Sequence, residues 1–228
     1  WYHFRQDSWE PPAPEGEGGP NFSSWTKERI GHLYEGSPDK DATGVVNKFV
    51  NAQGTDEDAH SIVARHIAAE GTVLLKNINN TLPLLRAQSA PNGKYRVGVY
   101  GEDAGPGQGP NACVDRGCNQ GTLASGWGSG AVDFPYLVCT WEALQHAWSK
   151  DSVDVKAYLT NNVAAQDLAE QDLCLVFVNA DGGEGFIRSD GIDADRNDLF
   201  LQKNGTQLVE GAAKHCGGGQ GKTVVIVH

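Results

Sequence analysis

The chain has 228 residues, enough for one large domain or for one domain with tails. It carries 29 acidic against 18 basic residues and a net charge of −11, which argues against nucleic acid or an anionic membrane as a partner. No run of about 18 apolar residues is present, so we expect no transmembrane helix. No signal peptide is visible and there is no methionine, so we expect a processed chain or a piece of a longer one.

The N-terminal part is predicted to be an arm or linker. Residues 11–20 are rich in proline and glycine, which disfavour both helices and central strands. We therefore divide the chain into a linker at 1–36 and one domain at 37–228.

Two helices and a strand are expected next. Apolar periodicity predicts a helix over 40–53 and a stronger one over 56–70, and residues 72–77 are predicted to form a short strand. His60 and His66 stand six residues apart on the second helix. That spacing does not suit shared metal ligands, so both are expected to be structural or solvated.

A glycine-rich turn follows a strand predicted at 96–100. Such a turn can cradle phosphate, and a nucleotide-binding α/β domain is therefore one alternative. The glycines of 101–110 lack the G-x-G-x-x-G spacing, however, and Pro106 and Pro110 remove backbone donors that a phosphate needs. Nucleotide binding is the least favoured reading.

Helices and strands alternate through the rest of the chain. Helices are predicted at 139–148, 161–170 and 204–215, and strands at 153–158, 173–178 and 223–228. This alternation predicts an α/β fold with a mostly parallel sheet and helices on both faces, an α/β sandwich. The last strand is expected to be buried.

Cysteines and glycosylation sequons point to an oxidising, secretory route. Cys113 and Cys118 are close enough in sequence to close a small loop, and no second pair stands at zinc spacing. Sequons begin at Asn21, Asn79 and Asn204. We therefore expect a secreted, extracellular glycoprotein.

A carboxylate follows the most apolar strand, 173–178. The strand is broken by Asn179 and the glycines after it, and Glu184 then stands between two glycines. Ligands of open α/β sheets bind beyond the carboxyl ends of the strands, so Glu184 is a candidate acid or base. The alternative is an ordinary solvated loop glutamate. The aspartates at 190–198 lack the ordered calcium spacing, and a loop tied by Arg196 is expected there, with no metal.

Four stretches resemble the second domain of fungal β-glucosidases of glycoside hydrolase family 3. They are V-F-V-N-A-D at 176–181 with G-E-G-F at 183–186 and D-R-N at 195–197, A-A-E-G-T-V-L-L-K-N at 68–77 with T-L-P-L at 81–84, C-V-D-R-G-C at 113–118, and W-G-S-G at 127–130. The resemblance implies that Glu184 is the general acid/base and that Ser129 contacts the glycone. It also implies a disulfide between Cys113 and Cys118. Phe186 stands where the family usually has tyrosine, and it would flank the leaving sugar.

The resemblance implies one part of a β-glucosidase. Such an enzyme hydrolyses terminal non-reducing β-D-glucosyl residues, as in cellobiose, with retention, and it uses no cofactor. The family's nucleophile is an aspartate on a preceding (β/α)8 barrel, and a barrel of about 250 residues does not fit in this chain. The expected partners are therefore a β-glucoside or glucose and the barrel, in cis or in trans.

The same resemblance bears on the ends of the chain and on activity. It implies that 1–36 leads out of the barrel and that the sandwich is incomplete at its C-terminal end. The fragment alone is expected to be inactive. A stand-alone, non-catalytic carbohydrate-binding or interaction fragment is the alternative, and homo-oligomerisation is left open.

Overall fold

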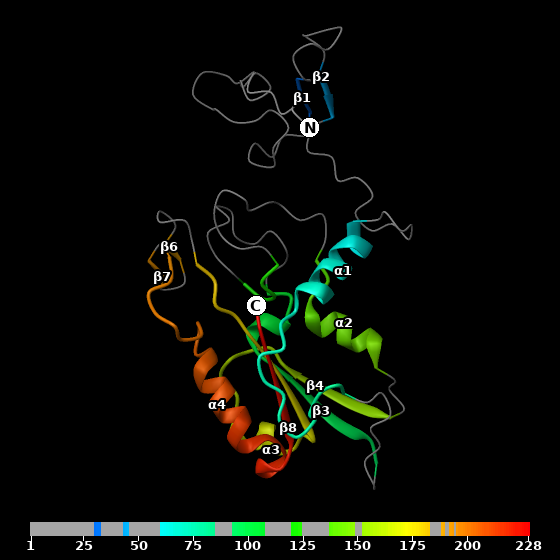
Figure 1. Ribbon diagram of the computed structural model, residues 1–228, viewed down its shortest axis with the longest axis vertical. Helices are drawn as coiled ribbons and strands as arrows, with labels where there is room; N and C mark the ends of the chain where they lie inside the picture. The colour runs from blue at the N-terminus through cyan, green and yellow to red at the C-terminus, as the bar shows by residue number, and fades with distance from the viewer. Residues whose placement is uncertain are drawn as a thin grey trace. The chain divides into compact units, whose positions relative to one another are not determined.

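The computed structural model describes residues 30–32, 43–45, 60–84, 93–107, 120–124, 137–148, 152–182, 188–189, 192–193 and 195–228. The chain divides into two compact units, 1–73 and 74–228. Figure 1 colours the described segments along the chain. The predicted boundary between 36 and 37 falls outside these segments and stays a prediction.

The first unit contains a short hairpin and a helix. Strand β1 (Ile30–His32) pairs antiparallel with β2 (Thr43–Val45), and helix α1 spans His60–Gly71. The helix predicted over 56–70 is therefore confirmed from His60 onward. The helix predicted over 40–53 is wrong at β2, because two β-branched residues flank a glycine there, and all three are poor helix formers.

Residues 72–77 do not form the predicted strand. They run as irregular chain with no ladder partner among the described residues, and the segment closes in a turn instead. The Asn77 amide donates to the Leu82 carbonyl at 2.9 Å, and the Leu82 N–H donates back to Asn77 Oδ1 at 3.1 Å. The apolar run of 72–75 resembled a strand, but a strand needs a neighbour to pair with, and local sequence cannot supply one.

The second unit is built on a four-stranded parallel sheet. Its strands are β3 (Tyr95–Tyr100), β4 (Val153–Tyr158), β5 (Leu173–Val178) and β8 (Lys222–Val227), in the order β4-β3-β5-β8. Every neighbouring pair is parallel. The four predicted strands are thus found within one residue of their predicted bounds, and the α/β class is confirmed.

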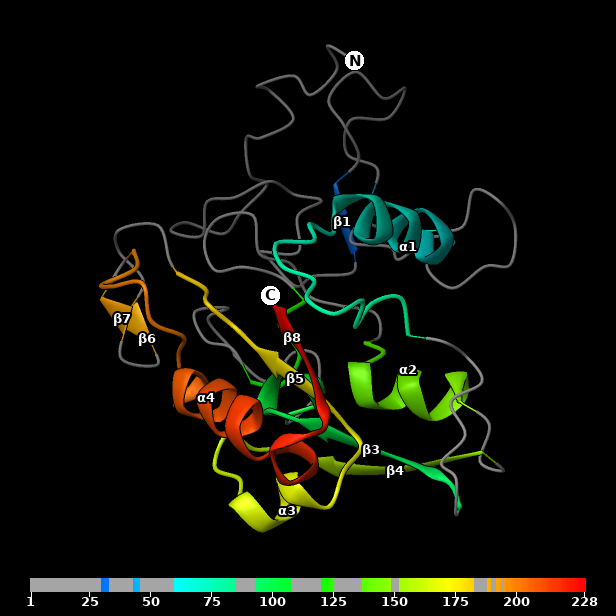
Figure 2. The same cartoon turned by 60° about the horizontal axis from the view of Figure 1, so that its bottom comes forward.

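Helices cover both faces of this sheet, as predicted (Figures 1 and 2). Helix α2 (Thr140–Ala147) lies on one face, and α3 (Ala165–Ala169) and α4 (Gly205–His215) lie on the other. Helix α3 is shorter than the predicted 161–170. The remaining short elements are η2 (Glu102–Ala104), η3 (Cys216–Gly219), β6 (Arg188–Ser189) and β7 (Ile192–Asp193).

Alternation of side chains along β5 divides the core into two clusters. The α4 cluster consists of Tyr100, Leu168, Cys174, Val176, Val178, Leu208, Ala212 and Cys216. The α2 cluster consists of Val97, Val99, Ala104, Leu173, Leu175 and Phe177, with Trp141, Leu144 and Trp148 packed against it. All six residues of β5 are buried, as a central parallel strand requires.

Strand β8 is only half buried, so the prediction of a buried last strand is wrong. Val224 and Ile226 pack against the α2 cluster, but Val225 is 39% and Val227 54% exposed. The strand has one ladder partner, β5, within the described sheet. Composition alone does not distinguish an outer strand from a central one, and this explains the error.

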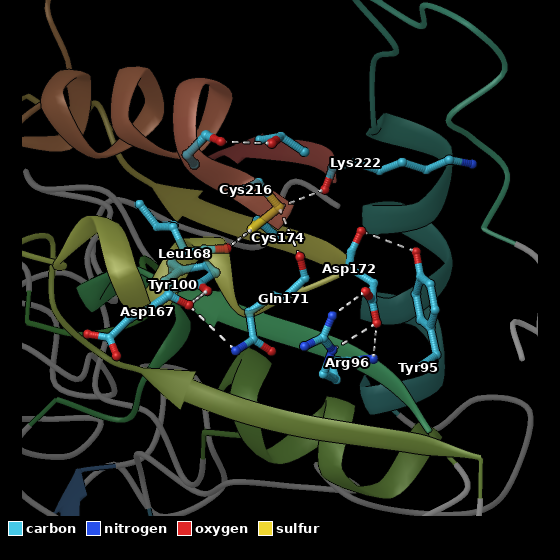
Figure 3. The surroundings of a disulfide bond; sticks show 12 residues. Tyr95, Arg96, Tyr100, Asp167, Leu168, Gln171, Asp172, Cys174, Cys216 and Lys222 are labelled. Atoms are coloured by element: carbon cyan, nitrogen blue, oxygen red, sulfur yellow. Dashed lines mark hydrogen bonds and ion pairs between the residues drawn. A yellow bond between two sulfur atoms is a disulfide. The ribbon is translucent and has the colours of Figure 1, made fainter. Parts of the chain in front are cut away.

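A disulfide joins Cys174 on β5 to Cys216 at the end of α4 (Figure 3). Both cysteines are buried, Cys174 at 0% exposure and Cys216 at 1%. Cys139 is a buried free thiol. The predicted Cys113–Cys118 bridge lies outside the described residues.

Two further contacts lie around the disulfide in Figure 3. The buried Tyr100 hydroxyl donates to the Asp167 carbonyl at 3.0 Å, which ties β3 to α3. Arg96 pairs with Asp172 at 2.7 Å where β3 and β5 begin. The Arg96–Asp172 pair braces the amino ends of β3 and β5, opposite the ends considered next. Within the described part of the chain, no helix has the length and apolar character needed to cross a bilayer.

Candidate functional site at the carboxyl ends of the strands

The carboxyl ends of the four parallel strands lie along one edge of the sheet. The chain passes from β3 outward to β4 and then returns to the other side of β3 as β5. The order therefore reverses between β3 and β5, and this is where open α/β sheets bind their ligands. The segments that emerge there begin at Gly101 after β3, Leu159 after β4, Asn179 after β5 and His228 after β8.

The turn after β3 requires glycine at its first position. Gly101 has φ of 110°, and a Cβ there would lie 1.9 Å from the Phe177 carbonyl oxygen on β5. The absence of a side chain thus lets the turn pass directly over the neighbouring strand. Glu102 begins η2 there, and Asp103, which follows it, is buried.

One buried amide connects three segments at this edge. The Glu102 N–H donates to Asn161 Oδ1 at 2.9 Å, and Asn161 Nδ2 donates to the Lys203 carbonyl at 2.8 Å. The Lys203 ammonium in turn lies 3.1 Å from a Glu102 carboxylate oxygen. The turns after β3 and β4 and the segment before α4 are therefore held in one arrangement.

Gln202, which lies shortly before α4, holds the turn after β5. Its side-chain amide forms two hydrogen bonds with the backbone of Asp181: the oxygen accepts from the Asp181 N–H at 3.3 Å, and the nitrogen donates to the Asp181 carbonyl. The Gln202 N–H also donates to the Asn179 carbonyl at 3.3 Å. All three residues are buried. The direction in which the chain leaves β5 toward 183–187 is thus fixed by hydrogen bonds.

The expectation that Arg196 ties the acidic loop is confirmed. Its guanidinium donates to the carbonyls of Asp198, at 3.0 and 3.1 Å, and Phe200, at 2.6 Å. A Cβ on Gly182 would lie only 3.3 Å from Arg196 Cγ, so the arginine also packs against the turn after β5. Within the segments that the structure describes, no group of three His, Cys, Asp or Glu side chains is placed to hold a metal ion.

The predicted catalytic and substrate-binding residues lie outside the described residues. This applies to Glu184, Phe186 and Ser129, and also to the sequon at Asn21. Their assignments stay predictions. Along the sequence, the described segments end at Gly182, just before Glu184, and at Ala124, before Ser129.

The sequons at Asn79 and Asn204 are described and lie at exposed positions. Asn79 has φ of 55° and Asn204 has φ of 65°, so both sit in left-handed turns. Asn204 immediately precedes α4. Both side chains are therefore on the surface, where a glycan needs its acceptor to be.

Sequence reasoning missed the long-range contacts of the second unit, and two of them illustrate why. One is the Cys174–Cys216 bridge, and the other joins Asp103 to His228 at 2.6 Å. Their partners are 42 and 125 positions apart in the chain. Nothing local marks such pairs. Only the parallel strand order brings them together.

A family model described as "Glycosyl hydrolase family 3 C-terminal domain" matches residues 72–228. Probable beta-glucosidase E of Aspergillus clavatus is 64% identical over 228 residues, which are 100% of this chain and 22% of that protein. Beta-glucosidase 1 of Aspergillus aculeatus is 46% identical over 218 residues, which are 92% of this chain and 23% of that protein.

Solved structures give the same result. A family 3 β-glucosidase from Neurospora crassa superimposes with a TM-score of 0.68 at 39% identity, covering 94% of this chain and 24% of that chain. The Chaetomium thermophilum β-glucosidase gives 0.67 at 41% identity, covering 91% and 23%. The chain thus spans less than a quarter of the length of these proteins. It belongs to glycosyl hydrolase family 3, and residues 72–228 correspond to the C-terminal domain of that family.

Proposed function

We propose that this chain is part of a longer β-glucosidase and contributes the general acid/base of retaining hydrolysis. The observation that carries the proposal is the 64% identity, over the whole chain, to a protein named as a probable β-glucosidase. The substrates are terminal non-reducing β-D-glucosides of the cellobiose type. The chain's sheet supports this role, because its carboxyl-end turns converge where α/β proteins bind ligands.

Retaining hydrolysis needs two carboxyl groups about 5–5.5 Å apart. In our proposal Glu184 first donates a proton to the glycosidic oxygen as the bond to the anomeric carbon breaks. It then takes a proton from the water that releases glucose from the glycosyl-enzyme. The attacking carboxylate comes from a (β/α)8 barrel domain outside this chain, in cis or in trans. Ser129 contacts the glycone, and Phe186 flanks the leaving sugar.

The described residues that precede Glu184 in the chain are held firmly, and this supports its proposed role as proton donor. A general acid must lie within hydrogen-bond reach of its substrate atom, so its loop needs firm anchors. Gln202 holds Asp181 on both sides of its backbone, and Arg196 packs against Gly182. The loop therefore starts from a point with little freedom, two residues before Glu184.

The direct test is Glu184→Gln in the full-length protein that carries this chain. We expect kcat/KM for cellobiose to fall about 10²–10⁴-fold, because the amide holds the same shape without a transferable proton. The first step with 2,4-dinitrophenyl β-D-glucoside should fall much less, because that leaving group needs little protonation. Glu170→Gln is the matched control, since Glu170 is an exposed glutamate on the second unit. Cellobiose hydrolysis within a few-fold of wild type in Glu184→Gln contradicts the role.

Assays of the isolated chain test the alternative that it is a non-catalytic carbohydrate-binding fragment. We expect the 228-residue chain to hydrolyse neither cellobiose nor aryl glucosides, since it lacks the attacking carboxylate. Glucose binding by the isolated chain, measured by calorimetry without turnover, favours a carbohydrate-binding fragment instead. Turnover by the isolated chain contradicts the division of the site between domains.

We also propose that the protein is secreted and carries glycans at Asn79 and Asn204. Both side chains are exposed, and the Cys174–Cys216 disulfide suits an oxidising compartment. Peptide mass spectrometry of protein from a eukaryotic host, before and after glycan removal, checks this. Two unmodified asparagines there contradict the proposal, and Asn79→Gln and Asn204→Gln separate the two sites.

A further inference from the structure

A buried carboxylate lies at the centre of the carboxyl-end turns. Asp103, in η2 directly after β3, is only 3% exposed. Burial of a charged group is costly unless partners replace its water. Its Oδ1 accepts from the Leu123 N–H at 2.8 Å, and its Oδ2 lies 2.6 Å from His228 Nδ1. Each carboxylate oxygen therefore has a hydrogen-bond partner, one in the segment around Leu123 and the other at the end of β8.

The histidine partner also holds the exit of β5 through its backbone. The His228 N–H donates to the Val178 carbonyl at 3.0 Å, and its carbonyl accepts from the Ala180 N–H at 3.1 Å. These bonds continue the β5–β8 ladder past Val227, where β8 ends. Asp103 is thus connected, through one side chain, to the point where the chain leaves the sheet.

Asp103 is linked to two segments, at Leu123 directly and at Ala180 through His228, and the chain continues from them to the proposed site residues. Ala180 precedes Glu184 by four positions, and Leu123 precedes Ser129 by six. The pair with His228 is charge-assisted, because the hydrogen bond to Asp103 raises the pKa of His228 although burial lowers it. A single carboxylate therefore fixes the starting points of both loops.

We propose that Asp103 and His228 are a positioning pair that holds the described residues Leu123 and Ala180, from which the chain continues to Ser129 and to Glu184. The inference rests on the proposed function. Neither residue is assigned contact with substrate. A displacement of about 1 Å in a catalytic group can cost about 100-fold in rate, so an anchor of this kind acts on chemistry through geometry.

Two substitutions at His228 separate its side chain from its backbone. His228→Phe keeps the ring's bulk and the main-chain bonds to β5 but removes the donor to Asp103. His228→Asn places an amide N–H near the position of Nδ1 and keeps that donor. In the full-length protein we expect His228→Phe to lower kcat/KM for cellobiose about tenfold or more. The loss for 2,4-dinitrophenyl β-D-glucoside should be under about threefold, because protonation matters little there. His228→Asn should recover most of the loss.

Other outcomes overturn the proposal. Cellobiose hydrolysis within threefold of wild type in His228→Phe means that the pair positions nothing. Equal losses on both substrates, with no recovery in His228→Asn, mean that the substitution disturbs the protein generally and that the hydrogen bond to Asp103 does not position the acid/base. Glu170→Gln, which breaks the exposed Lys156–Glu170 pair, is the control for loss of an unrelated ion pair. Should His228→Phe not fold, Asp103→Asn tests the charge of the pair instead, since it keeps the volume and an acceptor for Leu123, and the same loss confined to cellobiose is expected.

The two proposals fail in different ways. Glu184→Gln and His228→Phe are measured on the same pair of substrates. If only Glu184→Gln shows a loss that depends on the leaving group, the positioning pair is wrong and the acid/base assignment stands. If Glu184→Gln shows no such loss, the acid/base assignment is wrong whatever His228→Phe does.

Discussion

Removing the Cys174–Cys216 disulfide should destabilise the second unit strongly. The bridge spans 42 positions of sequence. A crosslink of that span lowers the entropy of the unfolded chain by an amount equivalent to about 4 kcal/mol at 25 °C. For a domain of roughly 150 residues this corresponds to a fall in Tm of about 8–16 °C.

The structure indicates that loss of the crosslink dominates this effect. Both sulfurs lie in the α4 cluster, and Cys216 Sγ is 3.4 Å from the Lys222 carbonyl, which a thiol can still reach. Reduction therefore changes the packing only locally, where the two sulfurs move apart to van der Waals distance. The Cys174→Ala/Cys216→Ala variant loses two buried sulfurs as well, and Cys139→Ala measures what deleting one buried sulfur costs without a crosslink.

The assay is thermal unfolding by circular dichroism after refolding with and without a phosphine reductant. We expect reduction to lower the Tm of the wild type and of Cys139→Ala by about 10 °C more than that of the double alanine variant, in which the predicted Cys113–Cys118 bridge is still reducible. Alkylation of the denatured protein should label Cys174 and Cys216 only after reduction. Equal melting temperatures for oxidised and reduced wild type, with alkylation confirming both states, would refute the reasoning.

Two further predictions concern the sheet itself. Gly101→Ala should cost about 3 kcal/mol or more, because the new methyl group meets the Phe177 carbonyl in a turn with positive φ; urea unfolding measures it, and a loss below about 1 kcal/mol contradicts the geometry. Asp172→Asn should cost about 1 kcal/mol at pH 7, since the pair is partly solvated. The hydrogen bond from Arg96 lowers the pKa of Asp172, so this stabilisation is present above the unfolded pKa of about 3.9 and is lost as the pH falls through the lowered pKa. Urea titrations of both proteins from pH 7 downward should therefore converge, and a constant difference excludes an ionic origin.

Local patterns were sufficient for most of the second unit. The runs at 153–158 and 173–178 are apolar or alternating and are bounded by turn residues, and both are strands with those bounds. The helix predicted at 139–148 is α2, and its neighbouring apolar side chains Trp141, Leu144 and Trp148 pack against the core. These elements follow from periodicity because burial on one face is enough to specify them.

Patterns failed where an element depends on its partner. Residues 43–45 carry apolar spacing that suits a helix, but they pair with β1. Residues 72–77 have strand composition, and within the described segments of the chain no strand pairs with them. The pairing energy of a strand comes from its neighbour, so short segments with mixed preferences are decided by tertiary contacts.

For the candidate site, the sequence alone predicted the loop that carries Glu184 and its acid/base chemistry, and both stay predictions. The break after an apolar strand, the glycine-flanked Glu184 and the family resemblance pointed to the carboxyl edge of a parallel sheet, and family membership is now shown. The sequence did not show which long-range contacts hold that edge of the sheet in place. Asp103 reaches His228 across 125 positions because β3, β5 and β8 lie side by side, and Cys174 meets Cys216 because α4 packs on β5. Such contacts depend on strand order and helix placement, which are set by long-range packing and leave no trace in local spacing.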